Sequence, residues 1–180
     1  LPSVNDAAAE QDMLNRAIET LTKALGKKPV GYRAPSWQFS QWTMKQVKDA
    51  GFLYDSSLMA SDDAYEILID KQPSGVIELP IERIVDDFPY FGGATNGGMP
   101  NPDEVEKVFQ SEFDVAYDEG GLFILTMHPH ITGHRSRVAG LEKLIVHMKS
   151  KGNVWFATHE QIARNVKGVK GVKNEIALRP

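Results

Sequence analysis

The chain has 180 residues, of which 42% are hydrophobic and 24% charged, so it can bury one core and has the composition of a globular protein. A net charge of −4 argues against a nucleic-acid-binding protein that works by neutralising phosphates. The absence of cysteine excludes disulfides, thiolate metal sites and a cysteine nucleophile. No apolar run approaches the ~20 residues of a membrane span, and no signal peptide is visible, so we expect a cytoplasmic location.

Helices are predicted where apolar residues recur every three or four positions between capping residues. They cover 6–25, 41–50, 102–119, 138–151 and a last helix from 158. Short apolar strands are predicted at 29–32, 52–54, 76–80, 122–127 and 154–157. The stretch 60–74 is polar and is predicted to have little core, and 86–101 is predicted to be an ordered loop. Because most strands are joined through helices, we predict a parallel α/β architecture, either a barrel or an open sheet.

Polar residues of the kinds used in acid–base chemistry follow several of these strands. Arg33, Asp55 and His128 each come directly after or at the end of a predicted strand, where α/β folds place their reactive groups. Each also has a structural interpretation: Arg33 could form an ion pair, and Asp55 could cap a turn before Ser56 and Ser57. The residues alone leave both interpretations open.

The histidines of the segment after 122–127 have the type and spacing of metal ligands. His128 and His130 are two residues apart, and His134 follows four residues later. Three imidazoles suit zinc, but no carboxylate lies within the same segment, so structural roles are favoured on spacing alone.

Aromatic residues gather on the segments around these polar positions, and aromatic side chains around a cleft suit sugar rings. Ordinary loop packing accounts for them equally well. The cluster consists of Trp37, Phe39, Trp42, Phe88, Tyr90 and Phe91.

Three motifs occur in a familiar order: Gly31-Tyr-Arg-Ala-Pro-Ser-Trp37, Gly51-Phe-Leu-Tyr-Asp-Ser-Ser57 and Leu125-Thr-Met-His-Pro-His130. They resemble the later motifs of the polysaccharide deacetylase (NodB-homology) family, in the branch of peptidoglycan deacetylases and allantoinases. The resemblance covers roughly residues 1–166 and leaves 167–180 as a basic tail. It implies the C-terminal part of a distorted (β/α) barrel.

The resemblance also implies hydrolysis of a carbon–nitrogen bond, typically in an N-acetylated amino-sugar polymer. Arg33 would orient the catalytic base, Asp55 would hold a histidine, and His128 would be that histidine, acting as the general acid. Substrate-binding roles are implied for a further set of residues along the cleft. The set consists of Trp37, Asp86, Asp87, Phe88, Tyr90 and His130.

The family's first two motifs, which supply the base and the ligands of a divalent metal such as zinc, are missing. We therefore expect a fragment that is inactive alone, whose partner is the missing N-terminal part, with the metal ligands outside this chain. A natural truncation is the other explanation. Alternative functions are hydrolysis of a cyclic amide or imide, and a non-catalytic carbohydrate-binding or assembly subunit. A homo-oligomer stays open.

Overall fold

The computed structural model describes residues 6–93, 98–168 and 174–177, and the chain divides into two compact units. Unit 1 is formed by residues 1–79 and 157–180, and unit 2 by residues 80–156. In the described ranges, no helix combines the length and the apolar character that crossing a membrane requires. The predicted division into 1–166 and a tail stays a prediction; part of that tail, 169–173 and 178–180, lies outside the described residues.

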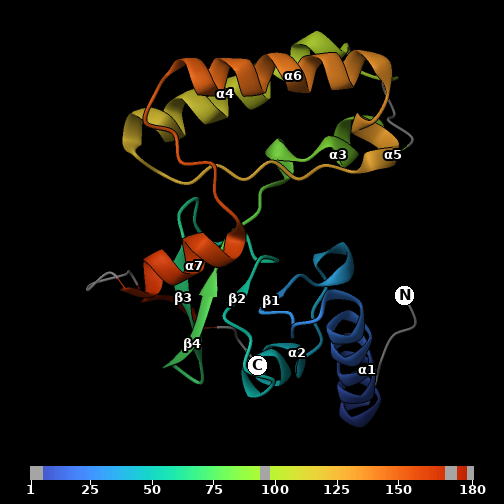
Figure 1. Ribbon diagram of the computed structural model, residues 1–180, viewed down its shortest axis with the longest axis vertical. Helices are drawn as coiled ribbons and strands as arrows, with labels where there is room; N and C mark the ends of the chain where they lie inside the picture. Colours follow the sequence, from blue (N-terminus) through green and yellow to red (C-terminus); the bar gives the residue numbers. More distant parts are fainter. Residues whose placement is uncertain (1–5, 94–97, 169–173, 178–180) are drawn as a thin grey trace. The chain divides into compact units, whose positions relative to one another are not determined.

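Unit 1 is built on a five-stranded sheet with the order β1-β2-β4-β3-β5 (Figure 1). The strands are β1 (Gly31–Tyr32), β2 (Tyr54–Asp55), β3 (Tyr65–Ile69), β4 (Gln72–Glu78) and β5 (Asn174–Ala177). Strands β1, β2 and β4 are parallel, as the alternation with helices predicts, whereas β3 is antiparallel to β4. The architecture is therefore mixed α/β with a parallel sheet and helices. The parallel register places Asp55 beside Glu78 at the ends of their strands.

Strand β3 corrects the expectation that residues 60–74 have little core. Its side chains alternate between faces, and Tyr65 and Ile67 are fully buried in the core of unit 1. Asp62 and Asp63 before it and Lys71 after it raise the polarity of the whole stretch, which hid a short alternating strand. The antiparallel turn at Asp70 and Lys71 uses two left-handed residues, which favours a tight hairpin.

Helices α1 (Ala7–Leu25) and α7 (His159–Gly168) of unit 1 begin with side-chain caps, whereas α2 (Thr43–Asp49) begins without one. A 3-10 turn lies at Pro35–Trp37. Asp6 accepts the Ala8 N–H at the start of α1, and Gly26 ends that helix in the left-handed region with φ 71°. At α7, Thr158 and Gln161 exchange the reciprocal hydrogen bonds of a capping box.

Unit 2 consists of helices around a second core. The elements are a 3-10 turn at Arg83–Val85, α3 (Asp87–Phe91), α4 (Pro102–Glu119), α5 (Pro129–Thr132) and α6 (Arg135–Ser150). Helices α4 and α6 pack against each other over buried Phe109, Phe113 and Leu144 (Figure 1). Helices α3 and α5 occupy parts of segments that the sequence predicted as loops, because Asp86 and Pro129 begin short helices there.

The prediction of two strands is wrong, because in the described part of the chain these segments do not pair with a neighbouring strand in a sheet. Residues 122–127 form a single bridge, between Thr126 and Asp86, and 154–157 form none within the described residues. Apolar composition favours a strand, but a ladder forms only where a neighbouring strand supplies hydrogen-bond partners. The apolar runs therefore predicted ladder pairing wrongly.

Candidate active site

A histidine and an aspartate far apart in the sequence are joined in unit 2. Nδ1 of His128 lies 2.6 Å from Oδ1 of Asp87, a separation typical of a charge-assisted hydrogen bond. This hydrogen bond orients the ring and leaves Nε2 as the nitrogen that can exchange a proton with another molecule. We call this pair the dyad; it is the arrangement by which enzymes orient an imidazole for acid–base chemistry.

Three donors hold the Asp87 carboxylate in place. Besides the contact with His128 Nδ1, Oδ2 accepts the backbone N–H of His128 at 2.9 Å and the hydroxyl of Thr132. The Asp87 side chain is 1% exposed, so water does not compete for these hydrogen bonds. The carboxylate is therefore a rigid platform for the imidazole.

The His128 ring is accessible on one side and flanked by aromatic rings on others. Its side chain is 34% exposed, and the centroids of Phe88 and His130 lie 5.3 and 5.7 Å away. Phe88 is itself exposed. The sequence-predicted substrate residues Phe88 and His130 are thus brought to the His128 ring, where a flat or partly apolar molecule could rest against them.

Short-range features place Asp87 at this position. Oδ1 of Asp86 accepts the Phe88 N–H at 2.9 Å, which caps α3 and makes Asp87 its first residue. The Asp87 N–H donates to the carbonyl of Thr126 at 3.1 Å, and Thr126 N–H donates to Val85 at 2.9 Å. These two bonds align the segment before α3 with the segment that leads to His128.

The same region contains a group of potential metal ligands. Asp86, Asp87 and His128 each offer one atom within 4.8 Å of the others, and no other such group of three occurs in the part of the chain described. From the sequence we expected the metal ligands to lie outside this chain and did not foresee this group, because 41 positions separate Asp87 from His128. His130 and His134 do not join the group.

The geometry of this group does not fit a resident metal ion. Two ligands of one zinc ion stand about 3 Å or more apart at normal metal–ligand lengths. Nδ1 of His128 and Oδ1 of Asp87 are 2.6 Å apart, and Asp86 Oδ1 accepts a backbone N–H. The three groups are arranged as a hydrogen-bonded dyad with a helix cap beside it, so we derive no step through a metal.

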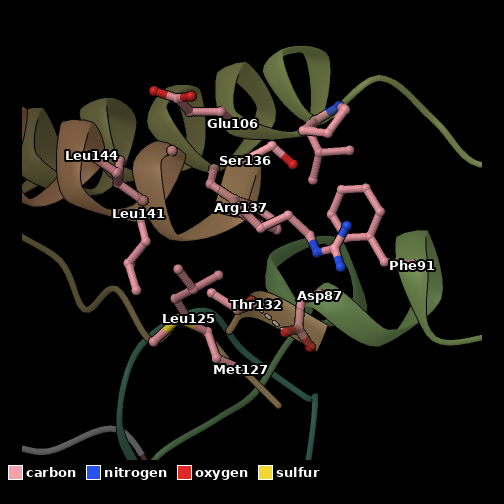
Figure 2. Close-up of a pocket in the computed structure, with 14 residues that line it drawn as sticks. Asp87, Phe91, Glu106, Leu125, Met127, Thr132, Ser136, Arg137, Leu141 and Leu144 are labelled. Carbon is pink, nitrogen blue, oxygen red and sulfur yellow. Dashed lines mark hydrogen bonds between the residues drawn. The ribbon is translucent and has the colours of Figure 1, made fainter. Parts of the chain in front are cut away.

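A small pocket adjoins Asp87 within unit 2 (Figure 2). The space in it that water can occupy is about 30 Å³, enough for one or two water molecules. Leu125 and its apolar neighbours form most of the wall, and Arg137 lies over the Phe91 ring at 5.0 Å. The pocket is too small for a sugar ring, so a sugar could meet His128 only at its exposed side.

Arg33 and Asp55 lie in unit 1. Arg33 donates to the Ser56 carbonyl through Nε at 2.8 Å and to the Ser56 hydroxyl through Nη2 at 2.7 Å. Asp55 is fully buried and accepts the Ser57 N–H at 3.0 Å, which is the turn-capping interpretation of this residue. The implied contact between Asp55 and His128 would join the two units and stays a prediction.

The remaining predicted residues occupy two different settings. Trp37 follows Ser36 in the loop after Arg33, and both have left-handed backbones with φ of 56° and 53°. Such non-glycine conformations store strain and are concentrated at functional sites. Tyr90 packs edge-on against Phe109 at 5.8 Å, at the margin of the unit 2 core. The substrate-binding roles of Trp37 and Tyr90 stay predictions.

Sequence reasoning assigned Asp87 to substrate binding and missed its hydrogen bond to His128. It missed Thr132 and Glu78 altogether. A signal for Asp87 was available, since Asp86, Asp87 and His128 all follow predicted strands and the ends of neighbouring parallel strands meet. No comparable signal pointed to Thr132, which is placed by one turn of α5.

Comparison with known proteins agrees with the motifs. The chain is 27% identical to the peptidoglycan deacetylase of Helicobacter pylori over 90% of its own length and 65% of that protein. The crystal structure of a Mycobacterium smegmatis protein assigned to the polysaccharide deacetylases is 33% identical, with a TM-score of 0.86 over 98% of this chain and 62% of that one. The crystal structure of an allantoinase is 26% identical, with a TM-score of 0.78 over 89% of this chain and 53% of that one.

No family model matches the chain. The chain spans between about half and two thirds of the length of these relatives. Sequence similarity and fold similarity agree over nearly all of the chain. The chain is therefore related to the polysaccharide deacetylases, over a portion of their length.

Proposed function

We propose that the protein containing this chain hydrolyses a carbon–nitrogen amide bond, and that its preferred reaction is removal of the acetyl group from an amino-sugar polymer such as peptidoglycan. The observation that carries the proposal is the dyad, in which Asp87 holds His128 with its ring partly exposed. The relatives named as deacetylases support the reaction class.

The role of the dyad follows from amide chemistry. Water adds to the acyl carbon and forms a tetrahedral intermediate, whose nitrogen leaves only after it is protonated. His128 would supply that proton from Nε2, the carbon–nitrogen bond would break, and a carboxylic acid and a free amine would form. The base that accepts the proton of water is implied by the family's first motif, which this chain lacks, so we assign no residue to it.

The aromatic surroundings of His128 favour a sugar as the substrate. Phe88 and His130 present rings beside His128, and aromatic faces are suited to sugar rings. The similarity to an allantoinase supports a second candidate, hydrolysis of a small cyclic amide or imide by the same acid. Both reactions need protonation of an amide nitrogen, so the dyad alone does not separate them.

The test is a substrate panel with the complete protein. Acetate release from N-acetylglucosamine oligomers and peptidoglycan would be measured beside ring opening of allantoin and succinimide. We expect acetate from the amino sugars. Activity on the small rings alone would establish the second candidate, and activity on none of them would contradict both.

A further inference from the structure

Two acidic side chains meet in the sealed interior of unit 1. Asp55 ends β2, Glu78 ends β4, and the parallel register places them side by side. Both residues are 0% exposed. The dyad and the motifs leave Glu78 without a role, although two wholly buried acids at one point are costly unless something compensates them.

The N–H and O–H groups around Asp55 and Glu78 are too few to stabilise a negative charge on both carboxyl groups. Ser57 N–H donates to Oδ2 of Asp55 at 3.0 Å and to Oε1 of Glu78 at 2.9 Å, so the two acids share one donor. Leu58 N–H adds a bond to Glu78 Oε1 at 2.9 Å, and the Ser57 hydroxyl adds one to Asp55 Oδ1 at 3.0 Å. Oε2 of Glu78 is buried and receives no N–H or O–H from the described groups.

A buried carboxyl oxygen that receives no hydrogen bond is the one expected to carry the proton when the group is a neutral carboxylic acid. Two carboxylates in contact cannot both be ionised in an apolar interior, so one proton stays on the pair. Burial and the neighbouring Asp55 raise the pKa of Glu78 to about 10, and burial also raises the pKa of Asp55. The register and the shared Ser57 N–H bring the two carboxyl groups together, and the raised pKa of Glu78 identifies it as the group that keeps the proton.

Other titratable groups face the pair from the adjacent strands. Tyr65 on β3 is the register partner of Glu78, and burial together with Glu78 raises the pKa of this phenol. Tyr32 on β1 has a pKa raised to about 12 by burial, Asp55 and Glu10. Both tyrosines are therefore neutral across the range in which the pair titrates and add no charge to it.

The turn that the pair holds also receives Arg33. Ser56 lies between Asp55 and Ser57, and its hydroxyl donates to the carbonyl of Leu79 at 2.7 Å. Arg33 donates to the hydroxyl and to the carbonyl of Ser56. The hydrogen bonds of Asp55 and Ser57 therefore hold in place the carbonyl and hydroxyl oxygens of Ser56, which orient the guanidinium of Arg33.

We propose that Glu78 is a positioning residue, which shares a single proton with Asp55 and so fixes the turn that holds Arg33. The expected effect of Glu78 on activity, which acts through Arg33, rests on the proposed function. The shared proton is a property of the fold and can be tested without any substrate.

The decisive measurement is the pH dependence of the unfolding free energy of the complete protein, for the wild type and Glu78→Gln. Gln keeps the Oε1 acceptor and can donate an N–H to Asp55 in place of the carboxyl proton. Because the folded pKa of Glu78 is raised, its contribution to stability is present below its unfolded pKa and is lost as the pH rises toward about 10. Between about pH 6 and 9, the folding constant of the wild type should fall about tenfold per pH unit relative to Glu78→Gln.

Glu66→Gln is the matched control, since Glu66 also accepts a backbone N–H, from Gly75, on a neighbouring strand. Glu66→Gln should keep the wild-type pH dependence. Equal pH dependence in the wild type and Glu78→Gln would overturn the proposal. A chelator that lowers the stability of the wild type but not that of Glu78→Gln would also overturn it, because a cation rather than a proton would then neutralise the pair.

Activity provides the positioning readout. Glu78→Gln should retain kcat within a few-fold, whereas Glu78→Ala should lose at least tenfold or fail to fold. A Glu78→Gln variant that is folded and inactive would refute the proposal, because its bonding pattern is conserved. If the wild type shows no activity on any substrate, the proposed function fails while the stability measurement still decides the shared proton.

Discussion

The dyad in unit 2 and the carboxyl pair in unit 1 use the same type of side chain in opposite ways. Asp87 and Asp55 are both fully buried and both accept several hydrogen bonds. Asp87 holds a histidine whose side chain is 34% exposed, whereas Asp55 holds Glu78, which is 0% exposed. The first arrangement can exchange a proton with a bound molecule, and the second can only retain one.

This difference shows that burial of an acid does not indicate its role. What separates the two sites is the partner of the aspartate and the access of solvent to that partner. An imidazole titrates near neutral pH and can cycle between its two states during a reaction. A carboxyl group with a pKa of about 10 stays protonated under the same conditions and serves the fold.

The largest effect on activity is expected at the dyad. His128→Ala removes the proposed general acid and should lower kcat of the complete protein by on the order of 10²-fold or more. His134→Asn is the matched control, because His134 is exposed and Asn remains a good residue at the start of α6. Near-wild-type turnover of His128→Ala would remove this residue from the mechanism.

Asp87→Asn is expected to have the next largest effect. The amide presents an N–H where the carboxylate accepts one, so the ring of His128 loses the partner that orients it. We expect kcat to fall by on the order of 10- to 100-fold in protein that circular dichroism shows to be folded. An unchanged kcat would mean that Asp87 serves only the fold.

Asp55→Asn makes the same substitution in the buried pair of Asp55 and Glu78 and should mainly lower the unfolding free energy. One of the bonds at Asp55 is lost, and its buried donor is left unsatisfied, which costs about 1–3 kcal/mol of unfolding free energy. Urea unfolding of the complete protein measures this. Stability equal to that of the wild type would show that the carboxylate is not needed to hold the turn.

Thr158→Ala sets the scale for a change outside both sites. It removes one half of the capping box at α7 and should cost about 1 kcal/mol of unfolding free energy, with kcat unchanged. Thr158→Ser, which keeps the hydroxyl, should restore most of that stability. A loss of activity in folded Thr158→Ala would show that kcat responds to any loss of stability and would weaken the comparison.

Local features of the fold were predictable from the sequence, and pairings between distant residues were not. The helices at 7–25 and 102–119 are specified by caps such as Asp6 and Gly120 within a few residues of their ends. The run 122–127 was predicted as a strand because its composition is apolar, yet in the described residues its single β-bridge joins Thr126 to Asp86. Whether a run becomes a ladder strand depends on chain that lies elsewhere in the sequence.

The candidate site shows the same limit. His128 and Arg33 were identified by their motifs, and the implied contact between His128 and Asp55 stays a prediction, but the hydrogen bond between His128 and Asp87 was not anticipated. The Asp86 cap and the Thr126 bridge position Asp87 for this hydrogen bond, and both form only in the folded chain. Glu78 gave no signal, because its importance comes from lying beside Asp55 across two strands.

The most direct test of the dyad is a double-mutant cycle on kcat with His128→Ala, Asp87→Asn and the combined variant. If Asp87 acts through His128, the combined variant should be about as slow as His128→Ala alone, because residues that act as a unit are not additive. Losses that multiply in the combined variant would show two independent roles and contradict the dyad as the acid of the reaction.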